Sequence, residues 1–352
     1  MNSDIDFVLL WVNNKDPLWK REMQKYSSKS ISYANNKNNY RDWDNLQYLF
    51  RAFEYFTPWV NKIHFVTYGH VPSWLNINNP KLSIVKHSDF LEDYNLPVFN
   101  SRAIEVNLHK IPNLSEKFVY FNDDFFILEK LSPNAFFKNN LPIDVCISDI
   151  MHEGEIAHTI VNNIDIINKH HNRHINTNLT KRSIILNNFT KWFSIKYGKY
   201  VLNTLLLLKW KTFTGFLTNH HPQPYLKSTF IELWRLEKNI LNLTSSSKFK
   251  DSKDVNQYLF RYWQLVKGNF IPDNYKNVFL KRKYVNLRSM NDVESAANDI
   301  KSRRYQFYCP NDTLEKSRFT KRSITEEEFE IAKKLIKDSL HTILPNKSSY
   351  EV

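Results

Sequence analysis

Short apolar segments alternate with amphipathic ones along the first 150 residues. Five runs rich in β-branched and aromatic residues have the length and composition of core strands. They are DFVLLWV, KIHFVTY, LSIVK, KFVYFN and DVCIS, which begin at residues 6, 62, 82, 117 and 144. Helical patterns lie between them, and this alternation is typical of an α/β fold with a mostly parallel sheet. Ligands of such folds bind at the carboxyl ends of the strands.

Apolar residues share one helical face in four segments, which are residues 44–59, 101–114, 254–265 and 323–344. The third is apolar enough to be a buried helix. The fourth has the clearest start, because Ser323 and Glu326 form a capping-box pattern ahead of its apolar stripe. We therefore predict a C-terminal helix that packs on the main domain.

The same pattern divides the chain into three parts. Residues 1–150 are predicted to form an α/β core. Residues 151–215 are mostly polar, rich in Asn, His, Lys and Thr, and are predicted to be a helical insertion. Residues 216–352 become aromatic again and are predicted to complete the domain with C-terminal helices.

The balance of charge is basic, with 49 Lys and Arg against 36 Asp and Glu, a formal net charge of +13. This excess predicts attraction to an anionic partner such as nucleic acid, a phospholipid surface or a phosphorylated substrate. Solubility with non-specific binding accounts for the charge equally well. A basic binding module for anionic polymers is the non-enzymatic alternative, but no known nucleic-acid-binding motif is detected, so no nucleic-acid partner is predicted.

Two cysteines, Cys146 and Cys309, exclude a disulfide framework and a cysteine metal site, and they favour a reducing compartment. The apolar N-terminal run follows no basic region and precedes no small-residue cleavage site, so a strand is predicted there and not a signal peptide. The longest later apolar segment is too short to cross a bilayer. We expect a cytoplasmic protein, peripheral at the inner face of the cell membrane through its positive charge.

One polar cluster interrupts an apolar run. Asn122, Asp123 and Asp124 follow the predicted strand KFVYF, although adjacent carboxylates repel each other. At the rim of a parallel sheet, such a pair can hold a divalent cation that bridges nucleotide phosphates. An Asp-initiated turn is the alternative explanation.

Several segments together resemble the Stealth family. IDFVLLWVNNKDPLW, from residue 5, is similar to its first conserved region, and residues 39–75 with 96–126 are similar to its second. HHPQPYLKSTF, from residue 220, resembles the third region, and KFKDSKDVNQYLFRYWQL, from residue 248, resembles the fourth. The likeness covers nearly the whole chain outside residues 151–215, and four motifs in the right order make it strong.

The resemblance implies a sugar-1-phosphate transferase of the capsule or cell-surface polysaccharide branch. It implies a UDP-sugar donor bound by a Rossmann-like core related to the glycosyltransferase-A fold, within residues 1–150. The acceptor would be a hydroxyl of a growing lipid-linked or oligomeric glycan, with UMP released and a phosphodiester formed. It also implies Mg²⁺ (or Mn²⁺) and contact with the membrane or with capsule-assembly proteins. An ordinary metal-dependent glycosyltransferase, which releases UDP, is the alternative.

Functional residues of the family carry over where its motifs match. The second-region glutamate falls on Glu105 and the second aspartate of the pair on Asp124, with Asp123 beside it as a further metal ligand. The third-region histidine falls on His220. The fourth-region arginine is replaced by Lys250, a point charge in place of a bidentate fork.

Three positions have alternatives. Arg261 could supply the fork that Lys250 lacks, and His221 could replace His220 as the base that takes the acceptor proton. Glu105 is predicted to lie early in its helix, where the dipole favours a carboxylate. Its role is that of a second base, a metal ligand or an acceptor for a sugar hydroxyl, against the alternative of a surface glutamate.

Three further pairs of polar residues are predicted to contact the donor. Asn13 and Asp16 follow the first strand, where uridine is expected to bind. Arg41 and Asp42 precede a helix, a natural place for phosphate or ribose contacts. Asn100 and Ser101 open the helix of Glu105, so they either cap it or touch the donor, and capping is favoured.

Overall fold

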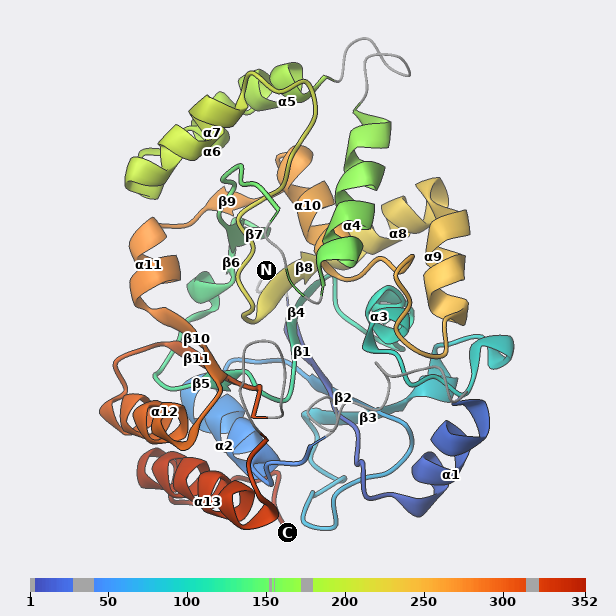
Figure 1. Ribbon diagram of the computed structural model, residues 1–352, viewed down its shortest axis with the longest axis vertical. Helices are drawn as coiled ribbons and strands as arrows, with labels where there is room; N and C mark the ends of the chain where they lie inside the picture. The colour runs from blue at the N-terminus through green and yellow to red at the C-terminus, as the bar shows by residue number, and fades with distance from the viewer. Residues whose placement is uncertain (1–3, 28–40, 152–153, 155, 172–179, 315–322) are drawn as a thin grey trace.

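A five-stranded sheet, ordered β3–β2–β1–β4–β8, lies at the centre of the described part of the chain (Figure 1). The computed structural model describes residues 4–27, 41–151, 154, 156–171, 180–314 and 323–352. The strands of this sheet are β1 (Ile5–Leu10), β2 (Ile63–Thr67), β3 (Leu82–Lys86), β4 (Lys117–Phe121) and β8 (Gln223–Leu226). Only β8 runs antiparallel to its neighbour; the other pairs are parallel. The predicted α/β class and mostly parallel sheet are confirmed.

Both faces of this sheet are covered, because its strands are apolar on both sides. Phe7 points to one face, where it packs with α2 (Leu46–Phe56), and Val8 points to the other. The first face also carries α12 (Met290–Ser302) and α13 (Glu326–Ile343), and the second carries α3 (Ser101–Glu105), α8 (Lys227–Leu236) and α10 (Tyr258–Val266). The apolar stripe predicted for residues 44–59 is buried in α2, and α10 is buried throughout, as predicted.

Two smaller sheets extend the fold in the described residues. One has the order β10–β11–β5 and the other β6–β7–β9. Their bounds are β5 (Phe126–Ile127), β6 (Phe137–Lys138), β7 (Leu141–Asp144), β9 (Ile271–Pro272), β10 (Arg282–Leu287) and β11 (Phe307–Asp312). Because β5 directly follows the acidic turn and β11 comes late in the chain, the pairing of β5 with β11 brings the C-terminal part to that turn.

The strand predicted to begin at residue 144 is wrong. The strand β7 ends at Asp144, and beyond it only Ser148 makes an isolated bridge, to Phe216. The next two amide groups bond to side chains instead of a neighbouring strand. The Val145 N–H donates to Asp144 Oδ1 at 2.7 Å, and the next amide donates to the hydroxyl of Tyr197 at 3.1 Å.

Two helix predictions need correction at their ends. The capping box of α13 is formed by Thr325 and Glu328, two residues later than predicted, because the Thr325 side chain accepts from the Glu328 amide. The segment 101–114 is not one helix. It splits into α3 and a 3₁₀ turn at Leu108–Lys110. Glu105 is therefore the last residue of a short helix, and the predicted dipole stabilisation at a helix start does not apply.

The described part of residues 151–215 is helical. It contains α4 (Ala157–His170), α5 (Lys181–Asn187), α6 (Phe189–Trp192), the 3₁₀ helix η6 (Ile195–Tyr200) and α7 (Val201–Leu207). The remaining helices are α1 (Pro17–Tyr26), α9 (Lys238–Ser246) and α11 (Tyr275–Leu280), with 3₁₀ turns at His87–Asp89, Asp93–Asn95 and Pro133–Ala135. No helix in the described ranges is long and apolar enough to cross a membrane.

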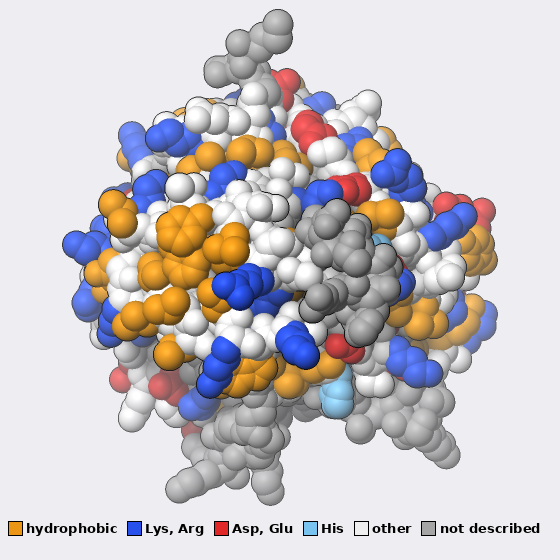
Figure 2. Space-filling model, turned by 90° about the horizontal axis from the view of Figure 1, so that it is seen from above, with side chains coloured by type: hydrophobic (Ala, Val, Ile, Leu, Met, Phe, Trp, Pro, Cys, Tyr) orange, Lys and Arg blue, Asp and Glu red, His pale blue; other side chains and the backbone are white. Residues whose placement is uncertain are grey.

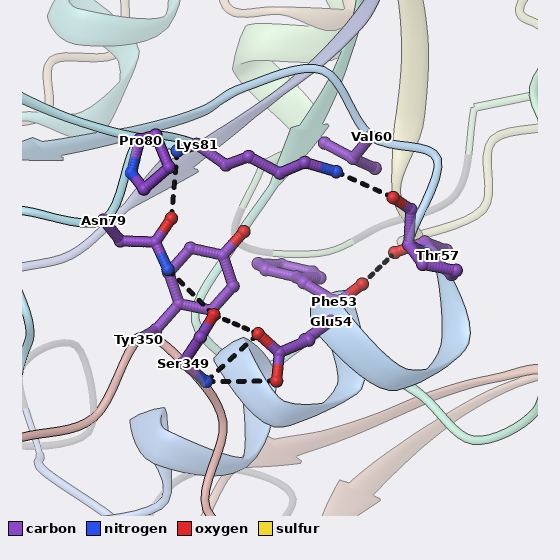
Figure 3. A pocket seen from close by; sticks show the side chains of 10 residues that line it. Phe53, Glu54, Thr57, Val60, Asn79, Pro80, Lys81, Ser349 and Tyr350 are labelled. Carbon is purple, nitrogen blue, oxygen red and sulfur yellow. Dashed lines mark hydrogen bonds between the residues drawn. The ribbon is translucent and has the colours of Figure 1, made fainter.

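The last eight residues dock beside α2. Glu351 forms a paired ion bridge with Arg51 at 2.7 and 2.8 Å, and both side chains are less than 10% exposed. Tyr350 packs against Phe50. Figure 3 shows a cavity of about 350 Å³ under this tail, in which Ser349 bonds to Glu54 of α2. Residues 345–352 are therefore held against α2, which packs on the main sheet.

Glu351→Gln is expected to lower the free energy of unfolding by about 3 kcal/mol, because it leaves the buried Arg51 guanidinium without a counter-charge. Burial opposes ionisation of Glu351, but the hydrogen bonds from Arg51 and Ser348, together with the charge of Arg51, outweigh it and lower the pKa below the ordinary 4.5. The stabilisation is thus fully present above pH 4.5 and is lost as pH falls through the lowered pKa. Urea unfolding at two pH values measures both effects; equal stability of the two chains at pH 7 would contradict the role of the pair.

Candidate active site

The acidic turn lies at the carboxyl end of β4, between β4 and β5 (Figure 1). The Phe125 amide donates to the Asn122 carbonyl at 3.2 Å, which closes the turn. Residues 122–124 therefore form a turn, and this turn stands at the rim of the parallel sheet. Both of these structural predictions are confirmed. The metal-binding role of these residues stays a prediction.

Three side chains from distant parts of the chain meet at this turn. Polar atoms of Asp124, His220 and Cys309 lie within 4.8 Å of one another. The Cys309 thiol donates to Asp124 Oδ2 at 3.2 Å, whereas Asp124 Oδ1 is buried with no hydrogen-bond partner among the described residues. Burial and the charge of Asp124 raise the pKa of the Cys309 thiol well above its usual value, so the thiol stays protonated and acts as a donor.

Asp123 stands beside this cluster and keeps contact with solvent. Partial loss of hydration beside the turn, the charge of Asp124 and the charge of Asp42 raise the pKa of Asp123 above its ordinary 3.8. The site thus concentrates negative charge, and a positive ligand would relieve it.

The donor set fits a hard divalent cation. Mg²⁺ binds through one or two carboxylates together with substrate phosphates and water. The unpartnered Oδ1 of Asp124 is a ready ligand, and Asp123 adds a second carboxylate beside it. Cys309 is a poor ligand for such a cation, because sulfur binds metals as the thiolate, whereas this thiol stays protonated and donates to Asp124.

His220 is held in place by aromatic rings. Its ring lies edge-on to Phe125 at 4.8 Å and to Tyr284 of β10 at 5.5 Å between centroids. Its Nδ1 is 3.4 Å from the hydroxyl of Tyr258. It remains partly exposed, as a residue that must reach a substrate requires.

The neighbouring histidine has different surroundings. His221 is buried, and this burial, with the charges of Arg282 and His220, lowers its pKa well below 6.5. It is His220 that lies in the cluster with Asp124. The geometry therefore favours His220 over His221 as the base.

Arg261 is engaged elsewhere. Its guanidinium makes a paired ion bridge with Asp144 at 2.7 and 2.8 Å, and it is 2% exposed. It also donates to the Leu217 carbonyl at 2.9 Å and to Thr218 at 3.4 Å. Holding a phosphate would require it to leave this ion pair, so the observed contacts favour a different task, that of positioning the segment that leads to His220.

Glu105 is buried, which excludes the alternative of a surface glutamate. Its Oε1 is 3.2 Å from the Tyr120 hydroxyl, and its Oε2 accepts from the Gln257 amide at 3.3 Å. The same hydroxyl is 2.6 Å from Asn122 Oδ1. A single tyrosine therefore connects Glu105 to the acidic turn, and Glu105 also connects α3 to the start of α10.

Asn100 caps α3, as favoured from the sequence, since its side chain accepts from the Arg102 amide. It also donates to the carbonyls of Ser247 and Phe249 and to Asp254, at 2.9–3.2 Å. These bonds fasten the loop that carries the exposed Lys250 to the start of α3. Ser101 is the first residue of that helix and is partly exposed.

The loop after β1 surrounds His70. The Asn13 amide donates to His70 Nε2 at 2.7 Å, and Asp16 Oδ2 is 3.9 Å from His70 Nδ1. Asp16 also caps α1 through the Trp19 amide at 2.7 Å. A capping role is therefore established for Asp16, and contact of either residue with uridine stays a prediction.

Arg41 and Asp42 lie close to the loop after β1 and to β11. Arg41 Nε is 3.5 Å from Asp312 of β11, and the guanidinium lies over the ring of Phe329. Asp42 is 3.9 Å from the Lys15 ammonium. Because the charge of Asp42 also affects Asp123, the loop that holds Asp42 lies near the acidic turn.

Cys309, Tyr284, Tyr120 and His70 were not anticipated as parts of the site. Cys309 is 185 positions from Asp124 in the sequence, and no local sequence pattern predicts that the two residues meet. Tyr120 could have been predicted from the sequence. Side chains alternate along a strand, so Tyr120 and Asn122, two positions apart, lie on the same side.

A mostly parallel sheet with an acidic turn and a histidine at its carboxyl edge is typical of α/β enzymes. Comparison with known families adds two matches. The model described as Stealth protein CR1, conserved region 1, matches residues 3–31, and that described as Stealth protein CR2, conserved region 2, matches residues 39–144.

Relatives align along nearly the whole chain. A capsular polysaccharide phosphotransferase WcwK of Streptococcus pneumoniae is 41% identical over 99% of this chain and 98% of its own. The receptor polysaccharide phosphotransferase WefC of Streptococcus oralis is 35% identical over 99% of this chain and all of its own. The exopolysaccharide phosphotransferase cps2G of Lactiplantibacillus plantarum is 33% identical over 99% and 96%. The chain belongs to the Stealth family and is a phosphotransferase enzyme.

Proposed function

We propose that this enzyme transfers a hexose-1-phosphate or N-acetylhexosamine-1-phosphate from a UDP-sugar to a hydroxyl of a growing glycan. UMP leaves, and a phosphodiester forms within a bacterial capsular or cell-surface polysaccharide. The names of the full-length relatives support the polysaccharide acceptor. The observation that carries the proposal is the cluster of Asp124, His220 and Cys309 at the sheet edge, in which Oδ1 of Asp124 has no hydrogen-bond partner among the described residues.

The reaction forms one bond to phosphorus and breaks another. The acceptor oxygen attacks the phosphorus that bears the sugar, and the bond from that phosphorus to the bridging oxygen of UMP breaks. UMP leaves with the electron pair of this bond. His220, partly exposed and held between Phe125 and Tyr284, takes the proton of the acceptor hydroxyl.

Asp124 and Asp123 would hold Mg²⁺ (or Mn²⁺). When bound, the ion neutralises the charge of the diphosphate and of the leaving UMP. Asp124 stays fixed through the thiol of Cys309, so its other oxygen keeps a defined direction. Glu105, through Tyr120 and Asn122, holds the acidic turn in a fixed position relative to α3.

The donor lies across the carboxyl edge of the sheet in this proposal. Asn13 and Asp16 face its uridine, and Arg41 with Asp42 face the ribose and phosphates. Lys250, exposed on the loop fastened to Asn100, contacts the non-bridging phosphate oxygens. A cytoplasmic location follows from the use of a nucleotide sugar, and the acceptor is a glycan, which can be lipid-linked.

Analysis of the nucleotide product tests the function. The protein is incubated with Mg²⁺ and a panel of UDP-hexoses and UDP-N-acetylhexosamines, with and without short glycan acceptors, and UMP is separated from UDP. Release of UMP that depends on the acceptor is expected from one donor. Release of UDP would instead identify a glycosyltransferase that forms an ordinary glycoside, and would overturn the proposal.

Cys309→Ala is expected to lower kcat about tenfold with little change in KM, because Asp124 loses the donor that orients it. Cys309→Ser keeps a donor at the same place and is expected to restore most of the rate. Steady-state kinetics of both variants measure the difference. If alanine and serine had the same effect, a loss of packing in the buried β11 would explain it and the positioning role would be wrong.

A further inference from the structure

The helices α5, α6 and α7, with η6 between the last two, expose apolar side chains to solvent. Ile195 is 95% exposed, Leu206 68% and Leu202 56%. The apolar side chains that make up this patch are Leu186, Phe189, Ile195, Leu202, Leu205, Leu206 and Trp210. We call it the outer apolar patch. In Figure 2, which looks onto the end of the molecule that carries these helices, hydrophobic side chains gather beside Lys and Arg.

The inner side of the same helices is already buried. Ile184, Ile185, Trp192 and Tyr197 belong to the core on the second face of the sheet. A helix that is apolar on its inner side needs no apolar outer side for folding. The residues of the outer apolar patch are therefore in excess of what the core requires, and contiguous exposed patches of this kind mark interaction sites.

The patch is held as a unit. The ammonium of Lys181, at the start of α5, donates to the carbonyls of Leu207 and Thr212 at 2.8 and 3.0 Å. The end of α7 is thus tied back to the start of α5. Leu202, Leu205 and Leu206 have the i, i+3 and i+4 spacing that places them on one face of α7.

The charge of this segment is strongly one-sided. Residues 181–212 contain seven Lys and Arg and no Asp or Glu. Among them, Arg182, Lys196, Lys199, Lys209 and Lys211 are exposed. Apolar side chains surrounded by exposed cations are the pattern of helices that lie in the interface of an anionic bilayer.

We propose that the outer apolar patch docks this enzyme onto the surface of an anionic lipid bilayer. The leucines and Trp210 enter the boundary between headgroups and acyl chains, while the lysines contact anionic headgroups. A second copy of the chain fits less well, because two such surfaces would bring like charges together. Nucleic acid would satisfy the lysines but would leave the exposed leucines without a partner.

Sedimentation of the full chain with lipid vesicles tests the docking. Binding is expected to vesicles of phosphatidylcholine with phosphatidylglycerol and to be weak with phosphatidylcholine alone. Leu202→Glu with Leu206→Glu is expected to weaken binding by at least about tenfold, through loss of apolar insertion. Lys209→Gln with Lys211→Gln is expected to weaken it about fivefold per lysine removed.

Controls separate docking from folding and from other partners. Ile331→Glu replaces a side chain on α13 that is 49% exposed, and it should bind vesicles like the unchanged chain. Circular dichroism and turnover with a short water-soluble acceptor should be the same in all variants. Vesicle binding that survives the double leucine change would overturn the proposal. So would a dimer that this change dissociates in the absence of vesicle binding, or a preference for single-stranded polynucleotide that the change does not affect.

Discussion

Asp124→Asn is expected to reduce transfer by about a thousandfold while the fold stays intact. Asparagine has the shape of aspartate and can still accept from the Cys309 thiol, but it lacks the charge that a metal ion and the diphosphate require. Stability should not fall, because Oδ1 of Asp124 has no partner to lose among the described residues and the repulsion of Asp123 is relieved. Initial rates of UMP release and a thermal melt measure the two quantities.

The matched control for this variant is Asp165→Asn, which removes an exposed carboxylate from α4, outside the site. Its rate should equal that of the unchanged enzyme. Turnover of Asp124→Asn within a few-fold of the unchanged enzyme would remove Asp124 from the catalytic group. A low rate together with a lower melting temperature would mean that the carboxylate supports the turn and not the reaction.

His220→Gln is expected to lower kcat by about 10²–10⁴-fold, the range for loss of a general base. Glutamine keeps a polar side chain between Phe125 and Tyr284 but cannot take a proton at neutral pH. The rate is measured with saturating donor and acceptor. If the proton goes to His220, the residual rate should also lose any pH dependence that belongs to this imidazole.

Two other histidines provide the contrast. His158→Gln changes an exposed histidine in the first turn of α4 and should leave the rate unchanged. His221→Gln changes a buried ring, and it should mainly lower the melting temperature. A larger loss of kcat in His221→Gln than in His220→Gln, at equal stability, would reverse the assignment of the base.

The parts of the fold that could be predicted from sequence are those that local pattern determines. The four parallel strands of the central sheet and the apolar face of α2 follow from the spacing of apolar residues, because burial is the dominant favourable term there. The end of β7 could not be read in this way. A carboxylate that accepts from the next amide, at Asp144, ended a strand that looked continuous in apolar character.

Only some residues of the candidate site could be predicted from the sequence. Asp124 and Asn100 stand at strand and helix ends, where polar residues in apolar surroundings are conspicuous. Tyr284 belongs to β10 and Cys309 to β11, and both strands reach the site because β11 pairs with β5. Pairing between strands so distant in sequence leaves no local periodicity, so neither side chain could be anticipated. The ion pair between Arg261 and Asp144 could not be predicted for the same reason, because the two residues are far apart in the sequence.

The pairing of β5 with β11 also sets an order of events during synthesis of the chain. Glu105 and Asp124 leave the ribosome long before the residues that orient and enclose them, since β11 begins at Phe307. A domain generally folds as a unit, and the N-terminal part of the chain is synthesised first. A nascent chain that ends before β11 therefore presents an unpaired edge at β5 and an incomplete site. Competence for transfer should arise late and abruptly, once β11 and the residues after it are free to fold.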